Sequence, residues 1–150
     1  MKLATIALAA FLVVLASSQD ARAQSFTLTV TPSSFAFPSG DPDTMPEVQS
    51  PMVTVSYKVT GAGKTAWHMA IRATSDLTSV SDTIPVANIR WTATAPLASG
   101  IALTTSDQTI LSRTGNMTQS TSTVIFYLKN LWTYKVGTYN TTIVFTLSSP

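Results

Sequence analysis

The sequence predicts an all-β protein, an antiparallel immunoglobulin-like β-sandwich of about eight or nine strands. Two features predict this class. Apolar and polar residues alternate with period two in many short windows, and clusters of Gly, Pro and Ser separate these windows. No window combines an apolar stripe of period 3.6 with helix caps. Only 11% of the 150 residues are charged, so Ser and Thr must supply much of the polar surface.

The first 23 residues are expected to be a cleavable signal peptide that precedes the fold. Met1-Lys2 gives a basic start, and the apolar stretch over residues 3–16 is too short to span a bilayer. Ala21-Arg22-Ala23 places small residues where a signal peptidase cuts. Cleavage after Ala23 leaves a single domain, residues 24–150, without a transmembrane segment. We therefore expect a bacterial protein that is secreted, periplasmic or exposed on the cell surface.

Three strands are predicted in the first half of the mature chain. Phe26, Leu28 and Val30 alternate with threonines until Pro32 interrupts the pattern, and residues 53–59 and 67–73 repeat the alternation. The connection over residues 38–51 contains four prolines, which cannot donate to a regular β-ladder. We expect it to be a surface loop or a crossing between sheets.

The second half continues in the same way. Alternation predicts strands over residues 86–94 and 139–147, and shorter strands over 101–104 and 109–112. Residues 123–129 are apolar on both faces, which is typical of a central strand that is covered on each side.

Two stretches of the chain resemble the WxL domain of bacterial surface proteins. Trp67-His68-Met69 leads into a polar turn with an Asp, and a Gly-x-Tyr strand near the end leads into Phe145-Thr146-Leu147 with a proline close behind. Met69 stands at the first Leu of the family signature, and Phe145 at its second Trp. The resemblance implies an extracellular β-sandwich that attaches non-covalently to the cell envelope, with peptidoglycan as the usual partner.

The last strand also looks like the end of a chaperone–usher pilin. Gly137 is followed by an alternating strand that runs toward Pro150. In a pilin-like subunit the strand with Phe26, Leu28 and Val30 could be a donor that completes the sheet of a neighbour. Alternatively, the strand with Phe26 and the strand after Gly137 are the ordinary first and last strands of one closed domain, and this alternative stays open.

The residues give little support for catalysis, and we expect a protein that is not an enzyme and has no cofactor. The chain has no cysteine and one histidine, His68, and no Gly-x-Ser-x-Gly motif accompanies it. The six mature acidic residues all fall in predicted loops. The mature chain keeps seven Lys/Arg and six Asp/Glu, a net charge of 7 − 6 = +1, which is too small for a nucleic-acid binder.

Two loops contain candidate binding residues. Asp41, Asp43 and Glu47 could ligate Ca²⁺, although turn formation by Asp side chains is the simpler interpretation. Trp132 and Tyr134 could stack on sugar rings while Lys135 reaches an anionic group, although Trp132 could instead plug the end of the sandwich. The expected partners are a cell-envelope glycan such as peptidoglycan, other surface proteins, or further copies of the chain.

Overall fold

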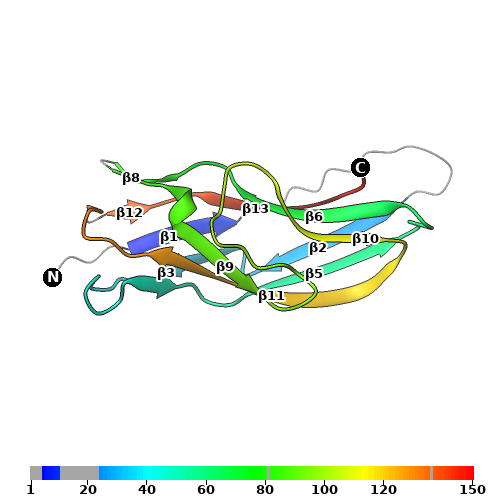
Figure 1. Ribbon diagram of the computed structural model, residues 1–150, viewed down its shortest axis with the longest axis horizontal. Coiled ribbons are helices and arrows are strands. Elements are labelled where there is room, and N and C mark those ends of the chain that lie inside the picture. The colour runs from blue at the N-terminus through cyan, green and yellow to red at the C-terminus, as the bar shows by residue number, and fades with distance from the viewer. Residues whose placement is uncertain (1–4, 11–23, 81, 136) are drawn as a thin grey trace.

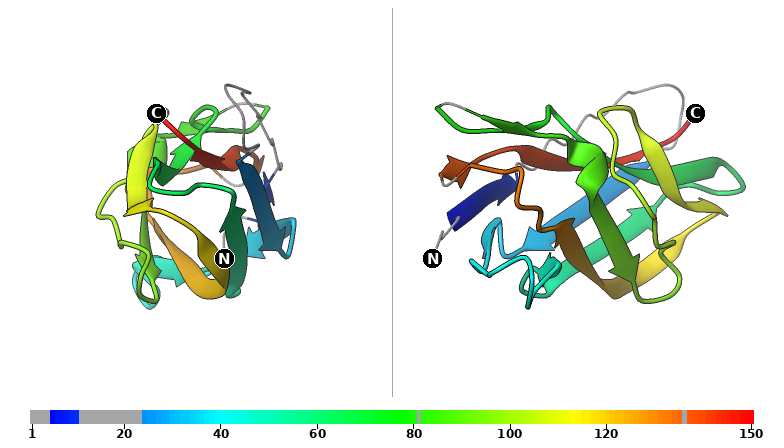
Figure 2. Two further views of the ribbon diagram at one scale, coloured as in Figure 1. Left: turned by 90° about the vertical axis from the view of Figure 1, so that its right-hand side faces the viewer. Right: turned by 60° about the vertical axis from the view of Figure 1, so that its left-hand side comes forward.

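The computed structural model describes residues 5–10, 24–80, 82–135 and 137–150, and it confirms the all-β class. Two largely antiparallel sheets face each other along the long axis of the molecule (Figures 1 and 2). A short 3-10 turn, η1 (Val86–Asn88), precedes the ninth strand. The strands are, in chain order, β1 (Thr5–Ala10), β2 (Ser25–Thr31), β3 (Ser34–Phe37), β4 (Glu47–Gln49), β5 (Val53–Thr60), β6 (Ala66–Ala73), β7 (Leu77–Thr78), β8 (Thr83–Ile84), β9 (Ile89–Ala93), β10 (Gln108–Thr114), β11 (Met117–Lys129), β12 (Thr138–Tyr139) and β13 (Thr142–Ser148).

The first sheet is built around the long strand β11. Strands β4 and β5 pair with one edge of β11, β9 pairs with the other edge, and β2 pairs with the far side of β5. Strands β4 and β5 are separated at Ser50, whose N–H donates to the Phe126 carbonyl (2.8 Å) and whose Oγ accepts from the Phe126 N–H (3.0 Å). The connection over residues 38–51, expected to lack ladder pairing, therefore contains a short strand, because Val48 is buried and the Ser50 hydroxyl replaces a ladder carbonyl.

The second sheet has the order β10, β6, β13, β1 and β3, with β12 lying beside β1 on the same edge as β13. Strand β1 runs parallel to β12 and β13 and antiparallel to β3, whereas the other pairs in this sheet are antiparallel. The residues of β1 lie inside the predicted signal peptide. Residues 1–4 and 11–23, including the predicted cleavage site, lie outside the described residues.

The chain changes sheets between β2 and β3. Pro32 has no N–H, so the pairing of β2 with β5 ends at Thr31, and the chain then enters the second sheet. In β3, Phe35 and Phe37 are buried while Ser34 and Ala36 are exposed. This strand was not predicted, because its four residues lie between two prolines.

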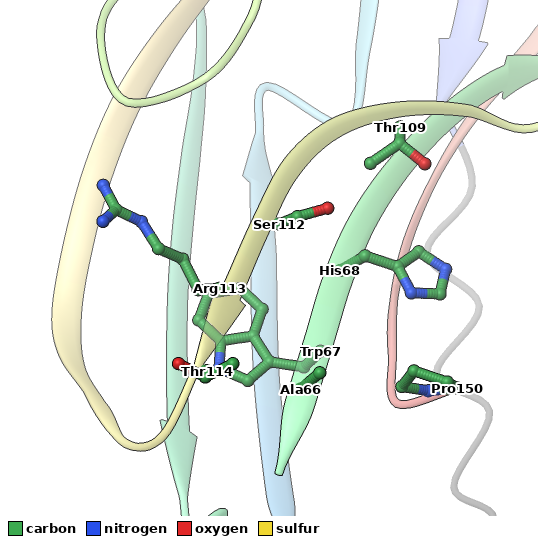
Figure 3. A pocket seen from close by; sticks show the side chains of 8 residues that line it. All are labelled: Ala66, Trp67, His68, Thr109, Ser112, Arg113, Thr114 and Pro150. Atoms are coloured by element: carbon green, nitrogen blue, oxygen red, sulfur yellow. The ribbon is translucent and has the colours of Figure 1, made fainter. Parts of the chain in front are cut away.

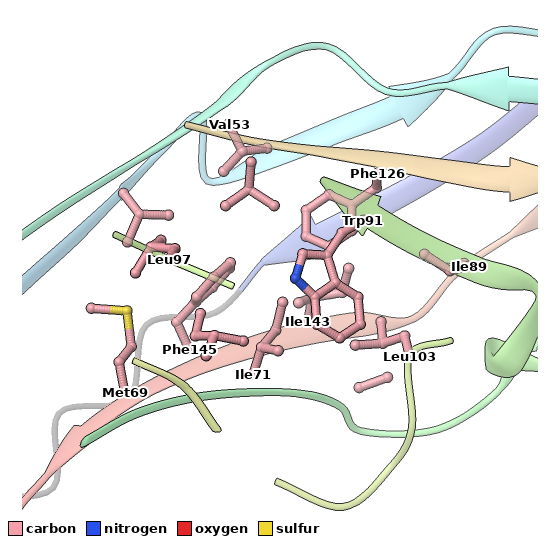
Figure 4. Packing of buried hydrophobic residues seen from close by; sticks show 14 of the residues in the cluster. Val53, Met69, Ile71, Ile89, Trp91, Leu97, Leu103, Phe126, Ile143 and Phe145 are labelled. Atoms are coloured by element: carbon pink, nitrogen blue, oxygen red, sulfur yellow. The ribbon is translucent and has the colours of Figure 1, made fainter. Parts of the chain in front are cut away.

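A common apolar cluster fills the space between the sheets (Figure 4). Trp67 and Tyr57 are among its largest fully buried side chains. The ring of Phe35 stacks on Phe126 with centroids 5.4 Å apart and meets Phe37 edge-on at 5.6 Å. Strand β3 is thus joined to the core through two aromatic rings.

The structure differs from the sequence-based prediction in strand β11 and at residues 101–104. Ile125 and Tyr127 of β11 are half-buried, so the outer face of this strand is not covered as a double-sided central strand would be. Instead, Arg90 lies over the Tyr127 ring, 3.9 Å from Cζ to the centroid, and its Nε and Nη2 donate to Glu47 at 2.7 and 2.5 Å. Residues 101–104 form no strand, because the loop they belong to folds over Trp91 and buries Leu103.

We expect Gly100→Ala to destabilise the fold by about 1–3 kcal/mol, since an added methyl group in a packed site forces its neighbours to move. A Cβ at Gly100 would overlap the ring of Trp91, which is only 3% exposed and donates from Nε1 to the Ala98 carbonyl. Urea unfolding of the variant measures the loss.

Gly40→Ala is the matched control. Its Cβ would meet chiefly the side chain of Met45, which is exposed and flexible and can move aside. Equal losses for the two variants would contradict the importance of the Gly100–Trp91 contact.

Candidate functional site

The most unusual feature of the sheet is the strand position between β3 and β13. Strand β1 occupies this position and pairs with both β3 and β13. Among the described residues, β1 is the one strand that pairs with β3. The other edge of β13 pairs with β6. If the predicted cleavage after Ala23 removes β1, two strand edges face each other across one vacant position, which we call the acceptor position.

The register of β1 defines what this position requires. Its residues 6 and 8 pair with Phe37 and Phe35, whereas residue 7 pairs with Ala36. Residues opposite each other in a sheet point to the same face, so every second residue of an occupying strand faces the core beside the two phenylalanines. If the position is vacant, the N–H and C=O groups of β3 and β13 that pair with β1 in the structure can pair with an incoming strand instead.

A hydrogen-bonded corner holds β12, just before the last strand, at the end where the acceptor position begins. The hydroxyl of Tyr139, a fully buried residue, donates to Asp82 Oδ2 (2.7 Å), and the Lys135 carbonyl oxygen lies 2.9 Å away as the alternative acceptor. The Lys135 N–H also donates to Asp82 Oδ2 (3.0 Å). The Lys135 N–H and the Tyr139 hydroxyl hold the pKa of Asp82 below its usual 3.8, and burial raises the pKa of Tyr139.

The predicted sugar-stacking residues do not form one exposed platform. Trp132 is 57% exposed, and its Nε1 donates to Asp43 Oδ1 (2.9 Å). Tyr134 instead packs against the core and its hydroxyl accepts from Asn88 Nδ2 (2.6 Å), while burial raises its pKa. Lys135 is exposed, and its backbone belongs to the Tyr139 corner.

The three predicted calcium ligands have three different partners. Asp41 Oδ1 accepts from the Asp43 N–H (2.9 Å) in an Asx-type turn, Asp43 accepts from Trp132, and Glu47 forms the ion pair with Arg90. The structure does not bring these carboxylates together. In the described part of the chain, no group of three or more His, Asp or Glu side chains could hold a metal ion.

The proposed donor residues Phe26, Leu28 and Val30 lie in β2, which pairs with β5 of the same chain along all seven of its residues. Of the positions that carry the WxL resemblance, Trp67 and Phe145 are core residues, and Trp67 Nε1 donates to the Gly115 carbonyl (2.8 Å).

A second candidate is the hollow beside β6 and β10, with a volume of about 560 Å³ (Figure 3). His68 lies on one side of β10 and Arg113 on the other, and no acidic residue lines the hollow. His68 Nε2 is 3.3 Å from Ser148 Oγ. The lining therefore offers the histidine no carboxylate partner of the kind that a hydrolase triad uses.

We expect Asp82→Asn to lower the melting temperature at neutral pH, because the carboxylate accepts hydrogen bonds from the Lys135 N–H and the Tyr139 hydroxyl at the corner. The pKa of Asp82 is lower in the folded chain than in the unfolded chain, so its stabilising effect exists above about pH 4 and disappears as the pH falls through the folded pKa. The difference in melting temperature between the variant and the wild type should therefore shrink on acidification, as calorimetry between about pH 2 and 7 would measure.

Asp107→Asn is the matched control, since Asp107 forms an exposed ion pair with Arg72 and should change the melting temperature little. If the difference in melting temperature between Asp82→Asn and the wild type stays constant with pH, the role assigned to the Asp82 charge is wrong.

In the described residues, no helix is long and apolar enough to cross a membrane. Comparison of the chain with models of known protein families gave no match, and comparison with curated proteins gave none either.

Proposed function

We propose that the mature chain is a non-enzymatic subunit of the bacterial cell envelope that assembles by accepting a β-strand from another polypeptide. The observation that carries this proposal is the acceptor position between β3 and β13, which in the structure is filled by residues of the predicted signal peptide. Once the signal peptide is removed, the Phe35 and Phe37 side chains and two rows of backbone groups need a replacement partner.

The strand order supports an immunoglobulin-like sandwich in which one strand is supplied from outside. A tyrosine whose hydroxyl bonds back to the chain just upstream is typical of strand F in such sandwiches, and Tyr139 with the Lys135 carbonyl has this arrangement. If β12 and β13, which pair with the same edge of β1, together correspond to strand F, then β6 occupies the place of strand C and β1 occupies the place of strand G. Strand β1 runs parallel to β13, opposite to the usual direction of strand G.

The donor is an extended segment with apolar residues at alternate positions. Strand β2 has this pattern in Phe26, Leu28 and Val30, but donating it would remove the partner of β5 and expose Leu28, which is 5% exposed. A segment outside the folded sandwich of the donor avoids this cost. Donation by β2 and WxL-like attachment to peptidoglycan both stay predictions, and so does the secreted, periplasmic or surface location.

We expect a peptide of residues 3–12 to bind residues 24–150 and to raise their melting temperature, because it restores the pairing of both edges. At a free concentration of 100 times Kd, the expected gain in unfolding free energy is about 2.7 kcal/mol. Differential scanning fluorimetry and fluorescence anisotropy of the labelled peptide measure the two effects.

Two peptide variants make this test specific. Leu8→Asp should abolish binding, because position 8 pairs with the buried Phe35, whereas Ala7→Asp should be tolerated, because position 7 pairs with the exposed Ala36. If the mature chain aggregates alone, rescue of its refolding by the Ala7→Asp peptide but not by the Leu8→Asp peptide supports the same conclusion. A stable monomer that ignores all three peptides would refute strand acceptance.

Electron microscopy of residues 24–150 recovered from their native envelope tests assembly directly. Because β2 keeps its pairing with β5, we expect complexes in which another polypeptide donates a separate segment. We expect these complexes to disappear when residues 3–12 are fused back through a flexible linker, because the acceptor position is then filled within one chain. Complexes that persist in the fused chain would show that assembly uses another surface.

A further inference from the structure

We infer that two copies of this chain pair edge to edge through β2, so that the first sheet continues from one copy into the other. The contact uses the outer edge of β2, by which we mean the edge turned away from β5 (Figure 1). The acceptor position lies in the second sheet, so this inference goes beyond the proposed function and does not depend on it.

The outer edge of β2 is open along its whole length. All seven residues of β2 pair with β5 on the other side, and no hydrogen bond to the outer edge of the backbone is found among the described residues. Strand β10, at the edge of the second sheet, is different: it has a bulge between Thr109 and Leu111, and its Ile110 carbonyl accepts from the Ala98 N–H (2.8 Å). The outer backbone groups of β2 are therefore available to another chain.

Strand β2 has none of the features that usually protect an open edge. Such edges are blocked by lysines, prolines, bulges or very short strands, or they are covered by a loop. Residues 25–31 contain no proline and no charged residue, and their pairing with β5 has no bulge. Strand β9, in contrast, is covered, because Trp91 exchanges backbone hydrogen bonds of 2.9 and 3.0 Å with Gly100 in the following loop. The edge of β2 is thus suited to pair with a further strand.

The apolar face of β2 fits a second copy of the same strand. Leu28 is 5% exposed, but Phe26 and Val30, which lie two positions before and after it, are only half-buried. When two copies pair antiparallel with Leu28 facing Leu28, the Phe26 of each copy faces the Val30 of the other. An aromatic residue opposite a β-branched residue is a stabilising pair in antiparallel sheets. The apolar surface that one copy leaves partly open is therefore the surface that a second copy covers.

The hydroxyl face of β2 favours the same register. Because Leu28 is the middle residue of β2, pairing about it uses the whole strand. The Thr27 of one copy then faces the Thr29 of the other, which is also a favourable pair, and no charged groups meet. A register centred on Thr29 would instead place Phe26 opposite Pro32, which has no N–H to donate.

Pairing about a single residue makes a closed two-fold dimer. Both copies use the same surface, so the contact is complete with two chains and adds no third. The strands that border the acceptor position belong to the second sheet and keep their places in each copy. If strand acceptance also holds, one dimer carries two acceptor positions, and a partner with two donor segments would bind it more tightly than it binds one copy.

Introduced cysteines test this register, because the natural chain contains none. In the pairing about Leu28, Ser25 of one copy faces Thr31 of the other, and both residues are exposed. Facing residues of antiparallel strands are close enough for a disulfide, whereas residues 25 and 31 of one strand are about 20 Å apart. The Ser25→Cys/Thr31→Cys variant of the full chain should therefore form covalent dimers under mild oxidation. Either single variant should give only trace dimer on a denaturing gel.

Ser25→Cys/Thr121→Cys is the matched control and should give no dimer, because Thr121 is exposed on β11, with β5 between it and β2. Abundant dimers from Ser25→Cys alone would indicate parallel pairing and overturn the two-fold register. Absence of dimer from every variant would reject the β2 contact. The full chain keeps β1 in the acceptor position, so none of these results depends on strand acceptance.

Charges on the exposed face of β2 test the contact a second time, in the Ser25→Cys/Thr31→Cys chain. Thr27→Glu with Thr29→Glu places carboxylates opposite each other twice, and we expect the dimer yield to fall about tenfold, because like charges directly opposite are destabilising. Thr27→Glu with Thr29→Lys places opposite charges there and should preserve the dimer. Residue 27 pairs with Lys58 of β5, so both variants place a carboxylate beside the same lysine, and their melting temperatures should be similar. Equal dimer yields from the two variants would contradict the inferred pairing.

Discussion

The requirement that buried backbone groups be paired governs the second sheet. Strands β3 and β13 each carry residues that reach deep into the core, so neither can move to the surface to hydrate its backbone. They are separated by one strand width, and β1 is the segment that satisfies both edges in the structure. The aromatic contacts of β3, the position of β12 and the Tyr139 corner all adjoin this one position. In the structure, the sandwich therefore depends on an extended segment from the first ten residues of the chain.

Much of the fold could be predicted from the sequence, because period-two alternation reports which strands have one face in the core. The strands with Phe26, Tyr57, Trp67 and Phe145 all follow this pattern and were predicted near their observed bounds. Strand β3 was missed although Phe35 and Phe37 alternate, because prolines on both sides suggested a loop. Residues 101–104 were predicted as a strand, but their backbone instead closes over Trp91.

The candidate site was less accessible from the sequence, because it depends on which strand edges become neighbours. Alternation reports the face of a strand that is buried but carries no information about its partners. Two separate stretches of sequence form the acceptor position and its occupant. The apolar N-terminal stretch was interpreted only as a targeting segment, and the alternation of Phe35 and Phe37 was not recognised as a strand. Asp82 was grouped with solvated loop residues, although its carboxylate organises the corner around Tyr139. Such a role depends on contacts between distant parts of the chain, since Lys135 lies 53 positions after Asp82 and Tyr139 lies 57 positions after it.

The attachment of β3 also determines how this part of the molecule opens. Its two aromatic side chains hold it to the core, whereas its backbone hydrogen bonds within the described chain go to β1. The protection of the β3 amides against hydrogen exchange is therefore set by the segment in the acceptor position more than by the global stability of the sandwich. Molecules with a filled position and molecules with an empty one would differ in the exchange of this four-residue strand. The amides of β5 and β11, which pair with each other, would exchange alike in both.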